Sequence, residues 1–295
     1  MQYLGSISCL SAALCWALAV TIFRGPIGNY GALAVNLFKC LLASIALGLT
    51  VFLSGQSHWT FDAPHNELGW LILSAMVGLV LGDSALFAAV RRIGGHSTLL
   101  FQTLSPVFAV SLAVALGERL RAMQWLGALI IMLGVLTVVI SKTGDGVSGV
   151  MSLAGIAFGL LAAFGQGVGV VLAKMGMATV PPVPATLVRL LSAGVGMIFV
   201  LGFLGGLGRF RLLVGSTPAL KRVVPASLIG TYIAMMLMMT GVSMAPASIA
   251  AVLLSMPPVF SLVVEAVVDR RRPSRGALLG TLVSIIGVGI LSWGG

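Results

Sequence analysis

Ten predominantly apolar runs occupy nearly the whole chain and limit the folds that it can adopt. A bilayer core about 30 Å thick is crossed by about 20 residues of α-helix, because each residue adds about 1.5 Å. Only 8% of the 295 residues are charged, against about 25% in a soluble domain. We therefore predict an all-α polytopic membrane protein with ten transmembrane helices, and we exclude a soluble enzyme and a nucleic-acid-binding domain. The predicted spans are Tyr3 to Phe23, Leu33 to Leu53, Leu68 to Val90, Ser97 to Leu116, Met123 to Ser141, Met151 to Ala173, Val183 to Phe203, Val223 to Ser243, Ala247 to Val268 and Ala277 to Trp293.

The first half of the chain recurs in the second half at a nearly constant distance. Residues 1–41 align without a gap with the residues 150 positions later, and further matches follow at offsets of 152 and 153. The matched residues include Arg24 with Lys174, Lys39 with Arg189, Gly78 with Gly230, and Pro106-Val107-Phe108 with Pro258-Val259-Phe260. Five spans per copy is an odd number, so the second copy crosses the membrane in the opposite sense. We predict two inverted five-helix repeats, residues 1–145 and 146–295, with a substrate site at their interface as in secondary transporters.

Several short motifs accompany this duplication. They are Trp16 late in the first span, the basic residue early in spans two and seven, Ser105-Pro106-Val107-Phe108 followed by Leu116-Gly117-Glu118-Arg119-Leu120, and Pro257-Pro258-Val259-Phe260. In this combination the chain resembles the ten-helix, EamA-type branch of the drug/metabolite transporter superfamily. The resemblance implies export of amino acids, other metabolites or drugs, and some relatives exchange nucleotide sugars or phosphorylated sugars. The second half departs from the pattern at Val268-Asp269-Arg270-Arg271 and at Gln166, which stands at the Trp16 equivalent.

Asp83 lies deep inside the third predicted span, roughly 10 Å from the nearer boundary at 1.5 Å per residue. A short carboxylate cannot reach water from that depth, so the residue is a candidate for function. It is either a structural partner of a hydroxyl such as Ser84, or a proton-titrating or cation-pairing group in a central cavity. Glu265 lies near the end of its span, where it could reach the interface or pair with Arg270; it is the second candidate for proton coupling.

Lys39 and Arg189 place one basic group at matching positions of spans two and seven. Their long side chains could extend to the interface, cap a broken helix or anchor lipid headgroups. Alternatively, they line the pathway and favour a substrate that carries a carboxylate or a phosphate.

Pro106 and Pro258 lie near the middle of spans four and nine, where each removes a helical hydrogen bond. We predict a hinge at each proline, with Gln102 and Ser105 supplying polar groups near the first. Gln166, Trp16 and Tyr232 are further candidates for the cavity wall, with ordinary helix packing as the alternative. No spacing typical of a metal or cofactor site is present, so none is predicted.

The net charge of +10 is a topology signal. Only Arg119, Arg121 and Lys174 fall in connections on the side of the termini. Both termini are therefore predicted outside the cytoplasm, although the family resemblance implies that they lie inside. The connections on the opposite side hold Arg24, Arg91, Arg92, Lys142, Arg209, Arg211, Lys221, Arg222, Arg270, Arg271, Arg272 and Arg275.

Together these features predict a secondary-active transporter of the cell membrane and not an enzyme. It would export a small polar or amphipathic metabolite, amino-acid-like or otherwise anionic, by alternating access, with proton coupling or substrate exchange as open driving forces. The expected partners are the small-molecule substrate, membrane lipids and protons, with no nucleic acid and no cofactor, in a monomer or homodimer. The alternatives are a membrane-embedded transferase and a lipid-flipping or assembly subunit.

Overall fold

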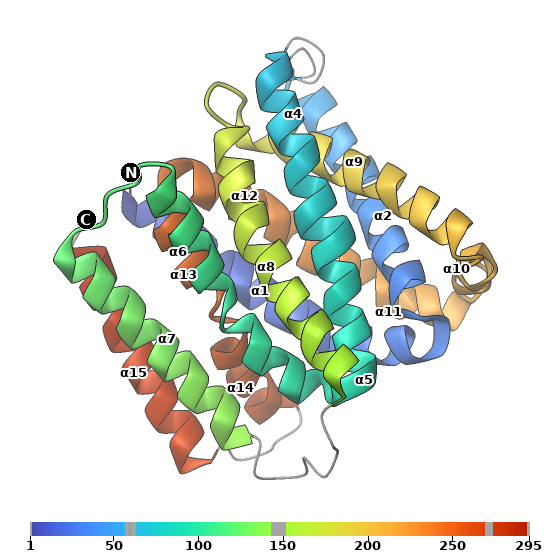
Figure 1. Cartoon of the computed structure of the whole chain (residues 1–295). Coiled ribbons are helices and arrows are strands. Elements are labelled where there is room, and N and C mark those ends of the chain that lie inside the picture. Colours follow the sequence, from blue (N-terminus) through green and yellow to red (C-terminus); the bar gives the residue numbers. More distant parts are fainter. Residues whose placement is uncertain (1, 57–58, 60–62, 143–151, 269–273, 294–295) are drawn as a thin grey trace.

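The structure is a computed structural model that describes residues 2–56, 59, 63–142, 152–268 and 274–293, and all elements in these ranges are helical (Figure 1). Seven segments are long and apolar enough to cross a membrane, and three shorter apolar helices accompany them. The prediction of an all-α polytopic membrane fold is confirmed, while the count of ten spans stays a prediction. The predicted boundary between the repeats, at residues 145 and 146, lies outside the described residues.

The first part of the chain, through residue 142, forms two helices, a long segment that contains a π-helical stretch, and two further helices. Gly31 alone separates α1 from α2, with a positive φ of 84° that a glycine adopts without strain. The elements are α1 (Gln2–Tyr30), α2 (Ala32–Leu53), α4 (His65–Ser74), the π-helix η1 (Ala75–Gly82), α5 (Asp83–Gln102), α6 (Ser105–Ala115) and α7 (Ala122–Lys142).

The second part repeats this order with one more short helix and one more break. A second π-helix, η3, lies in the segment that aligns with η1. The elements are α8 (Leu153–Met175), α9 (Pro182–Phe203), α10 (Leu207–Val214), α11 (Thr217–Ser227), η3 (Leu228–Ile233), α12 (Ala234–Met244), α13 (Ala247–Leu254), α14 (Pro257–Val268) and α15 (Arg275–Trp293).

Pro106 and Pro258 do not lie inside continuous helices, so the expectation that each removes a hydrogen bond in the middle of a helix was wrong, while a hinge at each proline stays a prediction. The chain leaves the helical path after α5 and again after α13, and each proline lies in the first turn of the next helix, α6 or α14. A proline costs little there, since the first N–H groups of a helix have no intrahelical partner. The predicted fourth span is therefore divided: its first residues extend α5, and the rest form α6.

Opposite charges cap the break between α12 and α13. Ala245 is extended there (φ −123°, ψ 158°), as favoured for a residue before a proline. The Lys174 ammonium donates to three carbonyls at the end of α12, those of Val242, Ser243 and Ala245, at 2.7, 3.0 and 2.9 Å. The Glu118 carboxylate accepts the first two N–H groups of α13 at 3.0 and 3.2 Å, and also the Ser248 hydroxyl. Each charge therefore complements the dipole of the helix end that it caps.

Close contacts at small residues join the two parts of the chain. A Cβ atom on Gly169 of α8 would lie 2.9 Å from the Cα of Gly78 in η1, so Gly169 has no room for a side chain. The repeat offsets relate this contact to a second one, in which Gly230 of η3 meets Ala19 of α1. At the edge of the bundle, α7 and α15 lie side by side (Figure 1).

Candidate functional site

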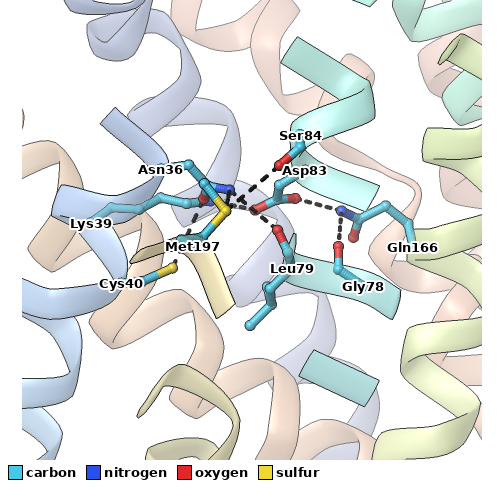
Figure 2. Close-up of polar contacts among 9 residues, drawn as sticks. All are labelled: Asn36, Lys39, Cys40, Gly78, Leu79, Asp83, Ser84, Gln166 and Met197. Carbon is cyan, nitrogen blue, oxygen red and sulfur yellow. Dashed lines mark hydrogen bonds and ion pairs between the residues drawn. The ribbon is translucent and has the colours of Figure 1, made fainter. Parts of the chain in front are cut away.

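A buried ion pair between Lys39 and Asp83 is the centre of a group of polar side chains (Figure 2). The Lys39 Nζ lies 2.5 Å from Asp83 Oδ2, and the two residues are 0% and 1% exposed. The other carboxylate oxygen, Oδ1, accepts a hydrogen bond of 2.6 Å from Gln166 Nε2. We call Asn36, Lys39, Asp83, Gln166 and Arg189 the central polar cluster. Asp83 is thus a cation-pairing residue, and the alternative of a bond to Ser84 was wrong, because that hydroxyl meets the Met197 sulfur.

The π-helix η1 determines where Asp83 lies. The Asp83 N–H bonds to the Gly78 carbonyl five residues earlier, which is the π-helical pattern. Two carbonyls of this segment accept side-chain hydrogen bonds: Gly78 from Gln166 Nε2 at 3.4 Å, and Leu79 from Asn36 Nδ2 at 3.2 Å (Figure 2). The segment thereby connects α2 and α8, which carry the two amides, to the start of α5.

Two aromatic rings lie close to the Lys39 ammonium. Its Nζ lies 4.9 Å from the ring centroid of Trp16 and 5.7 Å from that of Phe87, both within cation–π range. Trp16 was predicted for the site, whereas Phe87 was not. Phe87 could have been predicted from its position four residues after Asp83, since this spacing places both side chains on one helix face.

Arg189 on α9 is also buried, at 3% exposed, but its surroundings differ. Its Nη1 lies 3.1 Å from the Met239 sulfur, and its Nε has no hydrogen-bond partner. Among the described side chains, Lys39–Asp83 is the one carboxylate salt bridge within the central polar cluster. The cluster therefore holds two cations and one carboxylate. Neither cation extends to the interface, so that alternative was wrong for both.

The other predicted residues lie outside the central polar cluster. The Gln102 amide at the end of α5 is buried, and its Nε2 has no partner among the described residues. Ser105 begins α6, and its carbonyl oxygen packs against Gly167. Tyr232 in η3 has its hydroxyl 2.8 Å from the Thr50 hydroxyl. The backbone of Glu265 belongs to α14, and its side chain lies outside the described part.

Nothing in the described part of the chain forms a metal site, since no three His, Cys, Asp or Glu side chains come together there. The chemistry that the central polar cluster offers is charge pairing and hydrogen bonding. A buried ion pair with amide and aromatic neighbours can bind an ion or a polar group, and it can exchange partners when its helices move.

Comparisons with known proteins agree with this architecture. The chain matches the EamA-like transporter family over residues 3–140 and again over residues 153–293. It is 24% identical over 133 residues to the "Uncharacterized transporter YyaM" of Bacillus subtilis (strain 168), and this alignment spans 45% of this chain and 44% of that protein. A crystal structure of a protein that is 17% identical aligns over 97% of this chain and 95% of its own, with a TM-score of 0.76, and so has a similar fold. The chain is therefore a multi-pass membrane protein that belongs to the EamA-like transporter family.

Proposed function

We propose that this protein is a secondary-active transporter, and that it exports a small polar or amphipathic metabolite by alternating access to the central polar cluster. The observation that carries the proposal is the buried Lys39–Asp83 pair, bound by Gln166 from the opposite predicted repeat. Charged groups inside a membrane are costly, and they mark substrate and proton pathways in transporters.

The position of the cluster between the predicted repeats supports alternating access. Its residues lie on α2 and α5 in residues 1–145, and on α8 and α9 in residues 146–295. In inverted-repeat transporters the substrate binds at such an interface, and one repeat rocks against the other. The repeat-related contacts Gly78–Gly169 and Ala19–Gly230 support the same division.

Asp83 is the proposed proton-coupling group. In this structure its carboxylate is paired with the Lys39 ammonium. A conformation that separates the pair leaves a buried carboxylate without its cation, and such a group favours the protonated form. The protein would thus release a proton in one state and bind one in the other, as proton antiport requires.

The first experiment identifies a substrate. We would screen the purified protein for thermal stabilisation by amino acids, nucleotide sugars and cationic drugs. A soluble metabolite that stabilises the protein supports a transporter of small solutes. Stabilisation by lipid-linked compounds alone would favour a transferase or a lipid-flipping or assembly subunit.

The second experiment tests coupling in liposomes that contain the purified protein. Asp83→Asn should retain substrate exchange while losing pH-driven accumulation and the pH dependence of transport. Glu118→Gln is the matched control, since it also replaces a carboxylate by an amide but lies at the cap of α13. If Asp83→Asn accumulates substrate in response to a pH gradient as the wild type does, Asp83 is not the coupling group, and Glu265 becomes the residue to test.

The proposed orientation follows the distribution of basic residues, which puts both termini outside the cytoplasm of a cell-membrane protein. A single cysteine added at the C-terminus, in a variant without Cys9, Cys15 and Cys40, should react with an impermeant thiol reagent on intact cells. Labelling that requires cell lysis would contradict this orientation.

A further inference from the structure

Arg189 has more hydrogen-bond donors than the protein around it supplies acceptors. A guanidinium carries five N–H donors in a planar fork, and buried cations are normally paired. At Arg189 the Nε has no partner, and Nη1 meets a thioether sulfur, which is a weak acceptor. This side chain, 3% exposed, is thus an incompletely satisfied charge inside the bundle.

Asp83 does not fill this role, although it is the carboxylate of the central polar cluster. Lys39 takes its Oδ2 and Gln166 takes its Oδ1, both at short distances of 2.5 and 2.6 Å. Two cations against one carboxylate leave one positive charge in excess among the described residues of the cluster. One further negative charge would balance it.

We infer that Arg189 binds the anionic group of the transported molecule, and that this group is a single carboxylate. A carboxylate matches the guanidinium fork and can accept two parallel hydrogen bonds from it. It would take the place of the Met239 sulfur beside Nη1. Gly78, which has no side chain, lies beside Nη2, since a Cβ atom on it would be 3.6 Å from that nitrogen. The inference rests on the proposed function, because it assigns the substrate class of the same site.

The first test supplies the carboxylate from the protein itself. In Met239→Glu, the carboxyl carbon takes the position of the methionine sulfur, so its oxygens lie beside Arg189. The neutral variant Met239→Gln has nearly the same shape and is the control. If Arg189 awaits an anion, Met239→Glu should melt at or above the temperature of Met239→Gln in detergent. A Met239→Glu protein that melts well below Met239→Gln would show that Arg189 cannot accept a carboxylate, and the inference would fail.

The second test uses free anions and their neutral counterparts. We expect benzoate or leucine to raise the melting temperature of the wild type by roughly 2–4 °C at ten times its Kd. The matched amides, benzamide and leucinamide, should have no such effect, and neither should inorganic phosphate, which adds a second charge. The carboxylate response should be lost in Arg189→Gln and in Met239→Glu, and kept in Met239→Gln.

In this second test, three results would overturn the inference: no response to either carboxylate, an equal response to the amides, or a wild-type response in Arg189→Gln. These melting experiments need no transport, so the two proposals fail separately. A failed carboxylate test with intact pH-driven transport would remove the anion subsite alone. A carboxylate response without any transport would remove the proposed function and leave the subsite.

Discussion

Lys39 and Arg189 align in the two predicted repeats, and both are buried, yet their surroundings differ in charge. Lys39 faces a carboxylate and two aromatic rings, whereas Arg189 faces a methionine sulfur. The alignment explains the difference, because Asp83 corresponds to Met235, and Trp16 to Gln166. The duplicated cation was retained, but its partners were not. One half therefore holds a closed ion pair, and the other holds a charge that is available for binding.

The backbone of the two halves is more alike than their side chains. Both carry a π-helix at corresponding positions, and both pack it against the first helix of the other repeat through small residues. Backbone contact of this kind tolerates few substitutions, since any larger side chain separates the helices. The side chains beside it are less constrained, and there the halves have diverged.

The largest difference in stability between the two halves is expected when the two cations are removed one at a time. Lys39→Met leaves Asp83 buried without its cation and should lower the free energy of unfolding by about 3–5 kcal/mol. Arg189→Met removes a charge that lacks an ionised partner, so it should leave stability unchanged or raise it. Thermal unfolding of both variants in the same detergent measures the difference.

The double variant Lys39→Met/Asp83→Asn is the control for this prediction. It should recover most of the loss, because the unpaired carboxylate is gone. Equal destabilisation by Lys39→Met and Arg189→Met would break the comparison, since the two cations would then be equivalent.

A smaller effect is expected at Gln166. Gln166→Leu removes the short hydrogen bond to Asp83 Oδ1 and the longer one to the Gly78 carbonyl, and an acceptor such as this carboxylate oxygen costs about 2 kcal/mol when it is left unsatisfied. Gln102→Leu is the matched control, since the Nε2 of the Gln102 amide has no partner among the described residues. The stability of this variant should differ little from that of the wild type. We would compare the melting temperatures of the two variants. A larger decrease for Gln102→Leu than for Gln166→Leu would mean that the bond to Asp83 contributes little to stability.

The smallest effect is expected at Trp16. Trp16→Leu removes one aromatic face from the Lys39 ammonium and should cost about 1 kcal/mol, whereas Trp16→Phe should keep part of this contribution. The comparison is repeated in a Lys39→Met background, where no ammonium remains and the difference between Leu and Phe should shrink. An unchanged difference would assign Trp16 to packing alone.

Hydropathy and the internal repeat were sufficient to predict the fold class; burial cost singled out Asp83, and matching positions in the repeat singled out Lys39 and Arg189. Which of them meet could not be predicted. Lys39 and Asp83 come from different helices, so their contact depends on helix rotation, and η1 changes that rotation within the span. A π-helical turn does not change the hydrophobic periodicity of an apolar sequence in a recognisable way, so the helix face that carries Asp83 could not be predicted.

The prolines illustrate a second limit of the sequence. A proline inside an apolar run predicts a lost hydrogen bond, but a kink and a complete break give the same signal. Gln102 and Ser105 were selected as polar neighbours of Pro106, and Tyr232 as a polar residue within a span. The structure places Ser105 beside α8 and Tyr232 beside α2, and none of the three residues contributes to the central polar cluster.

The caps at the break between α12 and α13 have a mechanical consequence. Lys174 and Glu118 together satisfy three carbonyls and two N–H groups of the backbone there. If the α12–α13 break moved without Lys174 and Glu118, all five backbone groups would lose their partners. Each such group costs about 1–3 kcal/mol when it is left unpaired in an apolar setting. The break between α12 and α13 is therefore held by hydrogen bonds to the end of α8, which carries Lys174, and to the connection from α6 to α7, which carries Glu118. A rocking motion that keeps these hydrogen bonds moves the α12–α13 break, the end of α8 and the α6–α7 connection together.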